Sequence, residues 1–182
     1  MENTEKKQRK VFLSCGIPGS GKSTIVAKLA AEMGGEIVSR DAIHFSLLKE
    51  GEDYFSHESE VKSKYYEAIW RSVHNNEITF IDATHLDPNS RRITLGNTTY
   101  HNEDLDITYI ALYVTVPLGV ALKRNAKREG RACVPETAIA NMYARFKKPS
   151  VSREGFDEVW HINEDGEIFR KELQNGKNFY KF

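Results

Sequence analysis

The chain has 182 residues, of which 40% are hydrophobic and 29% charged, a composition that is typical of one folded domain and excludes a largely disordered chain. Its 26 lysines and arginines balance 26 aspartates and glutamates, so global charge draws it neither to nucleic acid nor to a membrane, and an anionic partner requires a local basic patch. No apolar run approaches the roughly 20 residues that cross a bilayer, and the two cysteines have no scaffold or metal-binding spacing, so we expect a cytoplasmic protein with no membrane and no disulfide partner.

Strand and helix patterns alternate along the first half of the chain. Residues 1–10 are polar and are expected to form a flexible N-terminus. The apolar run 11–15 predicts a buried strand, and apolar residues at helical spacing predict a helix over 22–33, ended by two glycines. The same criteria predict a strand at 36–39, helices at 41–49 and 58–74, and a strand at 77–82.

The second half continues this alternation. A proline at position 88 opens a helix, and the β-branched run 107–116 predicts a central strand covered on both faces. Helices are expected at 117–129 and 136–146, with a break between them at 130–135. A strand is expected at 156–162, followed by a hairpin strand at 167–170. The order predicts an α/β fold with a mainly parallel sheet. We expect one domain at 11–162, with a C-terminal hairpin or tail at 163–182 packed on it.

A phosphate-binding loop lies between the first predicted strand and helix. Residues 16–23 read GIPGSGKS and satisfy the pattern G-x-x-x-x-G-K-[ST]. A chance glycine turn is the alternative, but the pattern arises by chance in such a chain only about one time in a hundred. The sequence therefore predicts a three-layer α/β/α P-loop NTPase fold that binds ATP and Mg²⁺. The predicted nucleotide-binding residues are Gly16, Pro18, Gly19, Ser20, Gly21, Lys22, Ser23 and Thr24.

Two acidic residues follow the neighbouring strands. Asp82 ends the third strand and is expected, with Ser23, on the Mg²⁺ side, where it would act directly or through water. Asp41 follows the second strand, where a carboxylate can accept the proton of an attacking hydroxyl. Each has a plainer alternative. Asp41 has at least even odds of being a helix N-cap, and Asp82 could be a turn residue.

The third candidate feature is a basic stretch, residues 122–132. Arg124 and Arg128 are four residues apart on a predicted helix and would share a face, and Arg131 follows in the glycine loop. The stretch could begin a helical lid, about residues 124–146, whose arginines stabilise charge on a transferring phosphoryl group. A solvated basic face is the alternative, and spacing alone slightly favours it.

Several sequence blocks resemble one family. GIPGSGKST, Ser39-Arg40-Asp41, DATHLDPNSRR at 82–92, VTVPLGVALKRNAKR at 114–128 and VPETAIANMYARFKKP at 134–149 follow the order and spacing of the phage-type polynucleotide 5′-kinase domain, in the adenylate-kinase-like branch of P-loop proteins. The resemblance covers about residues 11–149.

The resemblance implies a role for each matching residue. Lys22 and Ser23 would hold ATP and Mg²⁺, Asp41 would be the general base, and Arg128 would contact the phosphates with Arg124 in support. Asp82 matches the acid of the third-strand motif. The acceptor side would include Arg40, His44, Thr84 and His85.

The chain also departs from this family. His44 stands where the phage enzyme has an acceptor-contacting arginine, Ala83 stands at the position of that arginine's acidic partner, and His85 replaces an asparagine. An extra residue near Glu129-Gly130 leaves the choice between Arg128 and Arg131 as the lid arginine open. We therefore expect an ATP-dependent kinase acting on the 5′-hydroxyl end of RNA or DNA, with a small hydroxyl compound as the alternative acceptor and an ATP-binding module without transfer activity as the third possibility.

Overall fold

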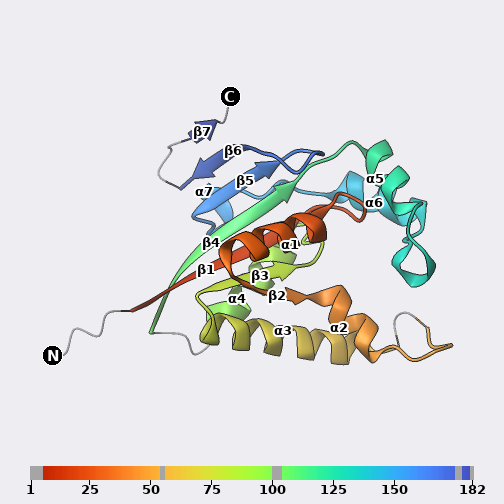
Figure 1. The fold of residues 1–182 in the computed structure, drawn as a ribbon, viewed down its shortest axis with the longest axis horizontal. Helices are drawn as coiled ribbons and strands as arrows, with labels where there is room; N and C mark the ends of the chain where they lie inside the picture. Colours follow the sequence, from red (N-terminus) through yellow and green to blue (C-terminus); the bar gives the residue numbers. More distant parts are fainter. Residues whose placement is uncertain (1–5, 54–55, 100–103, 175–177, 181–182) are drawn as a thin grey trace.

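The computed structural model describes residues 6–53, 56–99, 104–174 and 178–180. Its strands form one sheet in the order β2-β3-β1-β4-β5-β6-β7 (Figure 1). The strands are β1 (Lys7–Cys15), β2 (Glu36–Ser39), β3 (Ile78–Asp82), β4 (Leu105–Val114), β5 (Glu158–Ile162), β6 (Ile168–Leu173) and β7 (Asn178–Tyr180). The pairs among the first five strands are parallel, and β6 and β7 extend the sheet antiparallel.

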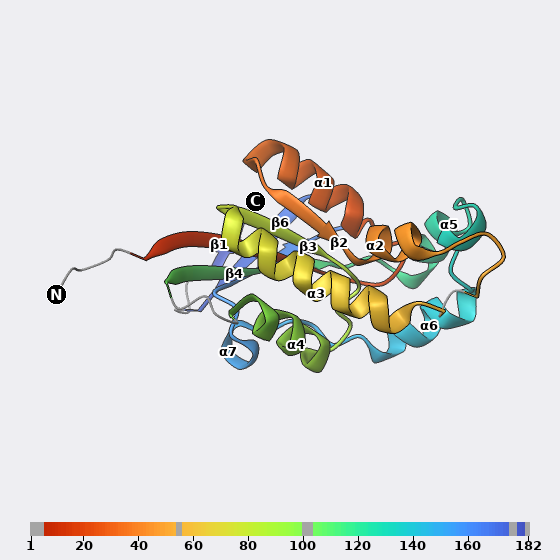
Figure 2. The same ribbon diagram turned by 90° about the horizontal axis from the view of Figure 1, so that it is seen from below.

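Helices cover both faces of the sheet, which confirms the predicted three-layer arrangement (Figure 2). They are α1 (Lys22–Met33), α2 (Arg40–Leu47), α3 (Glu58–Asn75), α4 (Pro88–Thr99), α5 (Leu118–Asn125), α6 (Glu136–Arg145) and α7 (Val151–Glu154), with a short 3₁₀ turn at Gly130–Ala132. None of these helices is long and apolar enough to pass through a membrane, within the part of the chain that the structure describes.

The two faces of β1 supply two separate cores. Val11, Leu13 and Cys15 point to the α3 and α4 side, whereas Phe12 packs on the α1 side. This alternation follows from the two-residue period of a strand. Phe12 stacks on Phe80, with ring centroids 4.6 Å apart. Both faces of the central strand are therefore buried, as expected for a parallel sheet.

The order of the strands determines where the site lies. After β1 the chain crosses to β2 and returns through β3, and it then continues on the other side of β1 at β4. The strand order reverses at β1, and ligands of open α/β sheets bind outside the carboxyl ends of the strands at such a point. The glycine-rich loop, residues 16–21, begins at the carboxyl end of β1.

The structure corrects several predicted boundaries. Residues 1–10 are not uniformly flexible, because β1 already begins at Lys7, which pairs with Leu105 of β4. Backbone pairing with a long neighbouring strand extends β1 through its polar residues, and side-chain polarity does not reveal such pairing. Helix α5 ends at Asn125, before the predicted end of that helix. The hairpin after β5 is confirmed, while α7 and β7 were not predicted.

Candidate active site

The glycine-rich loop has a conformation that requires its glycines. Gly19 and Gly21 have φ angles of 80° and 96°, in the left-handed region that favours glycine. A Cβ atom on Gly19 would lie 2.2 Å from the Ala121 carbonyl oxygen, and one on Gly16 would lie 2.8 Å from that of Val114. The loop is therefore packed tightly against the end of β4 and the middle of α5, which restricts the loop conformation.

Lys22 is the charged centre of this loop. It is 8% exposed, and its Nζ donates a hydrogen bond to the Ile17 carbonyl oxygen at 3.0 Å. Burial lowers the pKa of Lys22, while the carboxylates of Asp82 and Asp41 favour its charged form and the Arg128 guanidinium opposes it. Side chains from the end of β3, the first turn of α2 and the segment after α5 thus act electrostatically on one ammonium group.

The loop also has the polar groups that a triphosphate and Mg²⁺ need. The Ser20 hydroxyl is buried and has no hydrogen-bond partner among the described residues. Ser23 and Thr24 are exposed in the first turn of α1, and no side chain caps that helix at Gly21. Anionic oxygens bind well at uncapped helix N-termini. Pro18 is buried and shapes the loop. These residues fit the predicted nucleotide and metal.

Asp82 is held at the end of β3 beside the loop. It is 7% exposed, and its Oδ1 accepts a hydrogen bond from the Ser14 hydroxyl at 3.0 Å. The next residues connect this strand end to the loop: the Ala83 amide donates to Ser14 Oγ at 3.2 Å, and the Gly16 amide donates to the Thr84 carbonyl oxygen at 3.0 Å. Asp82 therefore has a fixed orientation beside the phosphate loop.

Asp41 lies in the first turn of α2 and is exposed. It is not the N-cap, because the helix begins at Arg40 and the Ala42 amide donates to the Ser39 side chain at 3.3 Å. The plainer alternative for Asp41 is therefore wrong. An exposed carboxylate that also acts on Lys22 is available to an incoming acceptor.

The residues expected on the acceptor side behave differently from one another. Arg40 pairs with Glu58 of α3, and Thr84 uses its carbonyl to hold the loop. His44 is fully buried in α2. The structure thus contradicts the expectation that the His44 ring contacts an acceptor, because the apolar side of α2 packs inward.

His85 is likewise a buried structural residue. Its Nδ1 donates a hydrogen bond to the Ser14 carbonyl oxygen at 2.7 Å, and its Nε2 lies 3.3 Å from the Thr94 hydroxyl. Burial lowers the pKa of His85 to about 4, so the ring is neutral at pH 7. The ring fastens α4 to the end of β1, so His85 is a hydrogen-bonded structural histidine here, and its expected place on the acceptor side stays a prediction.

The arginines of the basic stretch are separated by the end of α5. Arg124 donates to the carbonyl oxygens of Ser20 at 3.2 Å and Glu164 at 2.7 Å, so it joins the phosphate loop to the turn after β5. Arg128 lies beyond the helix and is exposed. The prediction that these two arginines share a helix face is wrong. The side chain of Arg131 lies outside the described residues.

Asn125 explains why the helix ends there. This buried side chain donates to the Val134 carbonyl oxygen at 2.7 Å and accepts from the Val134 amide at 3.0 Å. These bonds close the base of the exposed loop that carries Arg128. Helix α6 packs through fully buried Ile139 in an apolar cluster with Ile17 and Val116. Part of the segment expected to be a lid, residues 124–146, is therefore packed against the phosphate loop.

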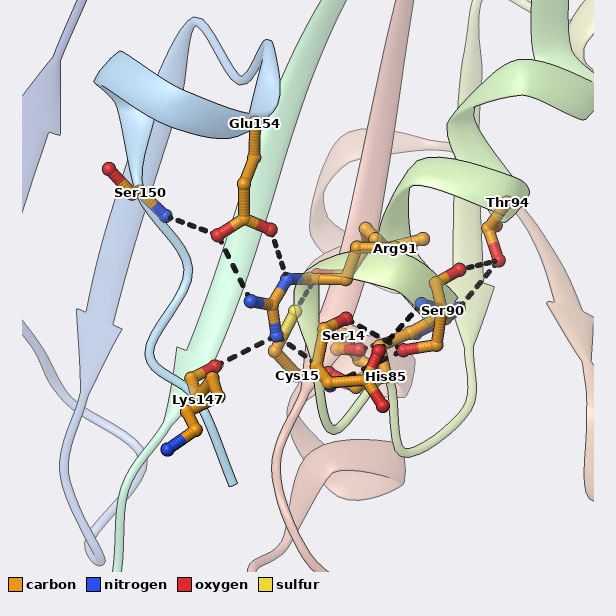
Figure 3. Close-up of polar contacts among 11 residues, drawn as sticks. Ser14, Cys15, His85, Ser90, Arg91, Thr94, Lys147, Ser150 and Glu154 are labelled. Carbon is orange, nitrogen blue, oxygen red and sulfur yellow. Dashed lines mark hydrogen bonds and ion pairs between the residues drawn. The ribbon is translucent and has the colours of Figure 1, made fainter. Parts of the chain in front are cut away.

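A buried ion pair behind the loop was not predicted. Arg91 of α4 is fully buried, and its guanidinium donates to both carboxylate oxygens of Glu154, at 2.6 and 3.0 Å (Figure 3). A sequence signal did exist, because Arg91 lies four residues before buried Leu95 and so occupies the inward face of α4. A charged residue on an apolar face indicates a buried partner.

The fold and this loop together define a P-loop kinase. The chain belongs to the AAA domain family (AAA_33), whose model matches residues 11–149. A curated relative, the L-seryl-tRNA(Sec) kinase of Methanococcus maripaludis, is 27% identical over 141 residues, which are 76% of this chain. The chain spans about half, 53%, of the length of that relative.

Solved structures with the same fold include proteins named for different substrates. A sugar kinase of Janibacter sp. HTCC2649 has a TM-score of 0.57 at 20% identity and covers 88% of both chains. Kti12 of Chaetomium thermophilum, in complex with ADP-AlF3, has a TM-score of 0.63 at 15% identity, covering 86% of this chain and 90% of that one. A fungal RNA kinase has a TM-score of 0.63 at 14% identity, covering 87% and 75%. The fold alone therefore does not determine the acceptor.

Proposed function

We propose that this protein transfers the γ-phosphoryl group of ATP to the 5′-hydroxyl end of RNA or DNA. The observation that carries the proposal is that Asp82 ends β3 beside the phosphate loop and that Asp41 follows Ser39, the register partner of Asp82, so both carboxylates come from the strand ends next to buried Lys22. The sequence blocks that resemble polynucleotide 5′-kinases contain these residues. The curated relative is named for a substrate that carries a tRNA, which is compatible with a substrate that contains nucleic acid.

The donor side follows from the geometry of the loop. The amides of the loop and the first turn of α1 would bind phosphate oxygens, and Lys22 would neutralise the β- and γ-phosphates. Ser23 and Asp82 would hold Mg²⁺, directly or through water, and the ion would supply further neutralisation of phosphate charge. Arg124 maintains the loop through its bond to Ser20.

The chain's own residues then account for the transfer step. Asp41 accepts the proton of the acceptor hydroxyl, whose oxygen forms a bond to the γ-phosphorus. The bond from that phosphorus to the β–γ bridging oxygen breaks, and ADP leaves with its electron pair. The guanidinium of Arg128, on the exposed loop, offsets the charge on the transferring group.

A small hydroxyl compound is the second candidate acceptor. The specific observation in its favour is the position of His44, which is buried where the resembling family places an acceptor-contacting arginine. Ala83 likewise replaces the acidic partner of that arginine. The fold neighbour named as a sugar kinase is compatible with this candidate.

The experiment that tests the proposal is transfer of labelled γ-phosphate from ATP to a panel of acceptors. The panel contains 5′-hydroxyl RNA and DNA oligonucleotides, nucleosides and simple sugars, and ADP formation is followed in parallel. We expect labelled oligonucleotide 5′ ends. Labelling of a small compound alone would support the second candidate. ATP binding with no transfer to any acceptor would support a nucleotide-binding module and contradict both kinase functions.

A further inference from the structure

The buried Arg91–Glu154 pair organises the surface around it. Besides its two bonds to Glu154, Arg91 donates through Nη1 to the carbonyl oxygens of His85 and Lys147, each at 2.9 Å (Figure 3). The Ser150 amide donates to the same Glu154 carboxylate at 3.1 Å. One guanidinium thus holds together the β3–α4 loop, the start of α4 and the segment that runs into α7.

Three exposed cationic residues are next to this neutral pair, either in sequence or through a backbone contact. Arg92 is adjacent to Arg91, Lys147 supplies one of its acceptors, and Arg153 is adjacent to Glu154; all three are exposed. Arg92 donates to the Asn89 side chain at 3.0 Å. In the described parts of the chain none of the three forms an ion pair with a carboxylate. The carboxylate of Glu154 is already satisfied by Arg91, so the surface has a local positive charge although the whole chain is neutral.

The surface is also hollowed. A pocket of about 340 Å³ is lined by Pro88, Asn89, Arg92, Arg153 and Glu154. Two guanidinium groups from different helices on one pocket can bind a phosphate group in bidentate fashion. Such contacts position a nucleic-acid strand without reading its sequence.

The pocket is close enough to the proposed reaction site for one strand to reach both. Pro88 lies six positions after Asp82, and a fully extended chain of six residues spans at most roughly 20 Å. About six nucleotides cover this distance at ~3.4 Å per nucleotide of a stacked strand, and an extended strand needs fewer. The Lys147 amide, which donates to the Leu86 carbonyl oxygen at 2.8 Å, fixes the intervening loop.

We propose that this pocket, formed by Arg92 and Arg153 between α4 and α7, binds a backbone phosphate of the acceptor strand a few nucleotides from its 5′ end. The inference rests on the proposed function and extends it, because it names a strand-binding surface away from the reacting hydroxyl. It also accounts for nucleic-acid binding by a chain with no net charge, since a local patch suffices.

The test compares a double variant, Arg92→Gln with Arg153→Gln, with a charge-matched control, Lys28→Gln with Arg71→Gln. Lys28 and Arg71 are exposed on α1 and α3, away from the pocket. Binding of a fluorescent, 5′-phosphorylated 12-nucleotide strand is measured by anisotropy from 50 to 200 mM salt. Because this strand is not an acceptor, the measurement does not depend on transfer.

We expect the double variant to bind about ten-fold more weakly than wild type and its salt slope to fall by about 0.7, the value for one lost phosphate contact on a single strand. The control variant should match wild type. Equal binding by the double variant and the control would overturn the inference.

A kinetic comparison separates the pocket from the proposed function. KM for a 5′-hydroxyl 12-mer should rise in the double variant, while KM for a nucleoside 3′-monophosphate, which is too short to reach the pocket, should stay constant. A pocket that binds the strand in an enzyme that phosphorylates no 5′ end would support the pocket and contradict the proposed function. Transfer to 5′ ends that is unaffected by the double substitution would support the proposed function and contradict the role of the pocket.

Discussion

Ser39 and Asp82 are register partners at the carboxyl ends of β2 and β3. Ser39 then caps α2, so the chain turns into the helix at the point where β3 delivers its acid. Asp41 therefore comes two residues after a residue paired with Asp82. The parallel pairing of two short strands brings together two carboxylates that are 41 positions apart in the sequence, both acting on Lys22.

Replacing Arg128 tests the proposed role of the exposed loop. Arg128→Ala should lower kcat about 10³-fold, because an arginine that offsets charge on the transferring group is worth that much or more. Lys127→Ala, in the same exposed loop, is the matched control and should change kcat little. A normal kcat for Arg128→Ala, with a large loss for Arg131→Ala, would assign the role to Arg131 instead.

Replacing Lys22 should separate stability from function. Burial lowers the pKa of Lys22, so its ammonium costs folding free energy, and stability should rise with pH from that lowered pKa toward the unfolded value of about 10.4. Lys22→Met should therefore raise Tm in the absence of ATP, by about 2–4 °C per kcal/mol gained. It should also abolish the increase in Tm on adding ATP and Mg²⁺. A lower Tm in the absence of ATP, or a preserved ATP response, would contradict this account.

His85 should make the fold sensitive to acid. The pKa of this histidine is about 4 in the folded state, so between pH 6.5 and 4 the unfolded chain takes up a proton that the folded chain does not. The free energy of unfolding should have its full value above pH 6.5 and should fall by up to about 3 kcal/mol as the pH drops to 4.

His85→Asn supplies the control for this pH dependence. Asparagine tolerates the positive φ of 45° at this position and can donate to Ser14 without titrating. Urea unfolding at several pH values should therefore give a shallower acid dependence for the variant. Identical pH profiles for the two proteins would mean that His85 does not titrate as described.

Removing one partner of the Arg91–Glu154 pair should lower the stability of the fold strongly. Arg91→Met or Glu154→Gln should each cost about 3–5 kcal/mol, because a buried charge loses its partner. The double variant Arg91→Met with Glu154→Gln should lose much less than the two single losses combined, as measured by urea unfolding. Additive losses would show that the two side chains do not interact in solution.

The sequence predicted the features that depend on local pattern. The period of apolar residues located the five parallel strands and α1, and the glycine-lysine motif located the phosphate loop with its strand and helix flanks. Local signals succeed here because the central strands β1, β3, β4 and β5 have buried apolar runs and because glycine or proline marks the turns before α1, α4 and α5.

Features that depend on distant contacts were not predictable in the same way. The i, i+4 spacing of Arg124 and Arg128 suggested one helix face, but the bonds of Asn125 to Val134 end α5 between them. The resemblance placed His85 on the acceptor side, whereas its contact with Ser14, 71 residues away, buries the ring. Such outcomes depend on tertiary packing that no single segment encodes.

The most direct measurement of the central claim compares wild-type protein with Asp41→Asn for transfer of labelled γ-phosphate to a 5′-hydroxyl oligonucleotide, with ATP binding measured on both proteins. We predict that the variant loses transfer while its affinity for ATP stays within a few-fold of wild type, because Asp41 is exposed and belongs to α2 rather than to the phosphate loop. Transfer by Asp41→Asn at the wild-type rate would contradict the assignment of this carboxylate as the general base.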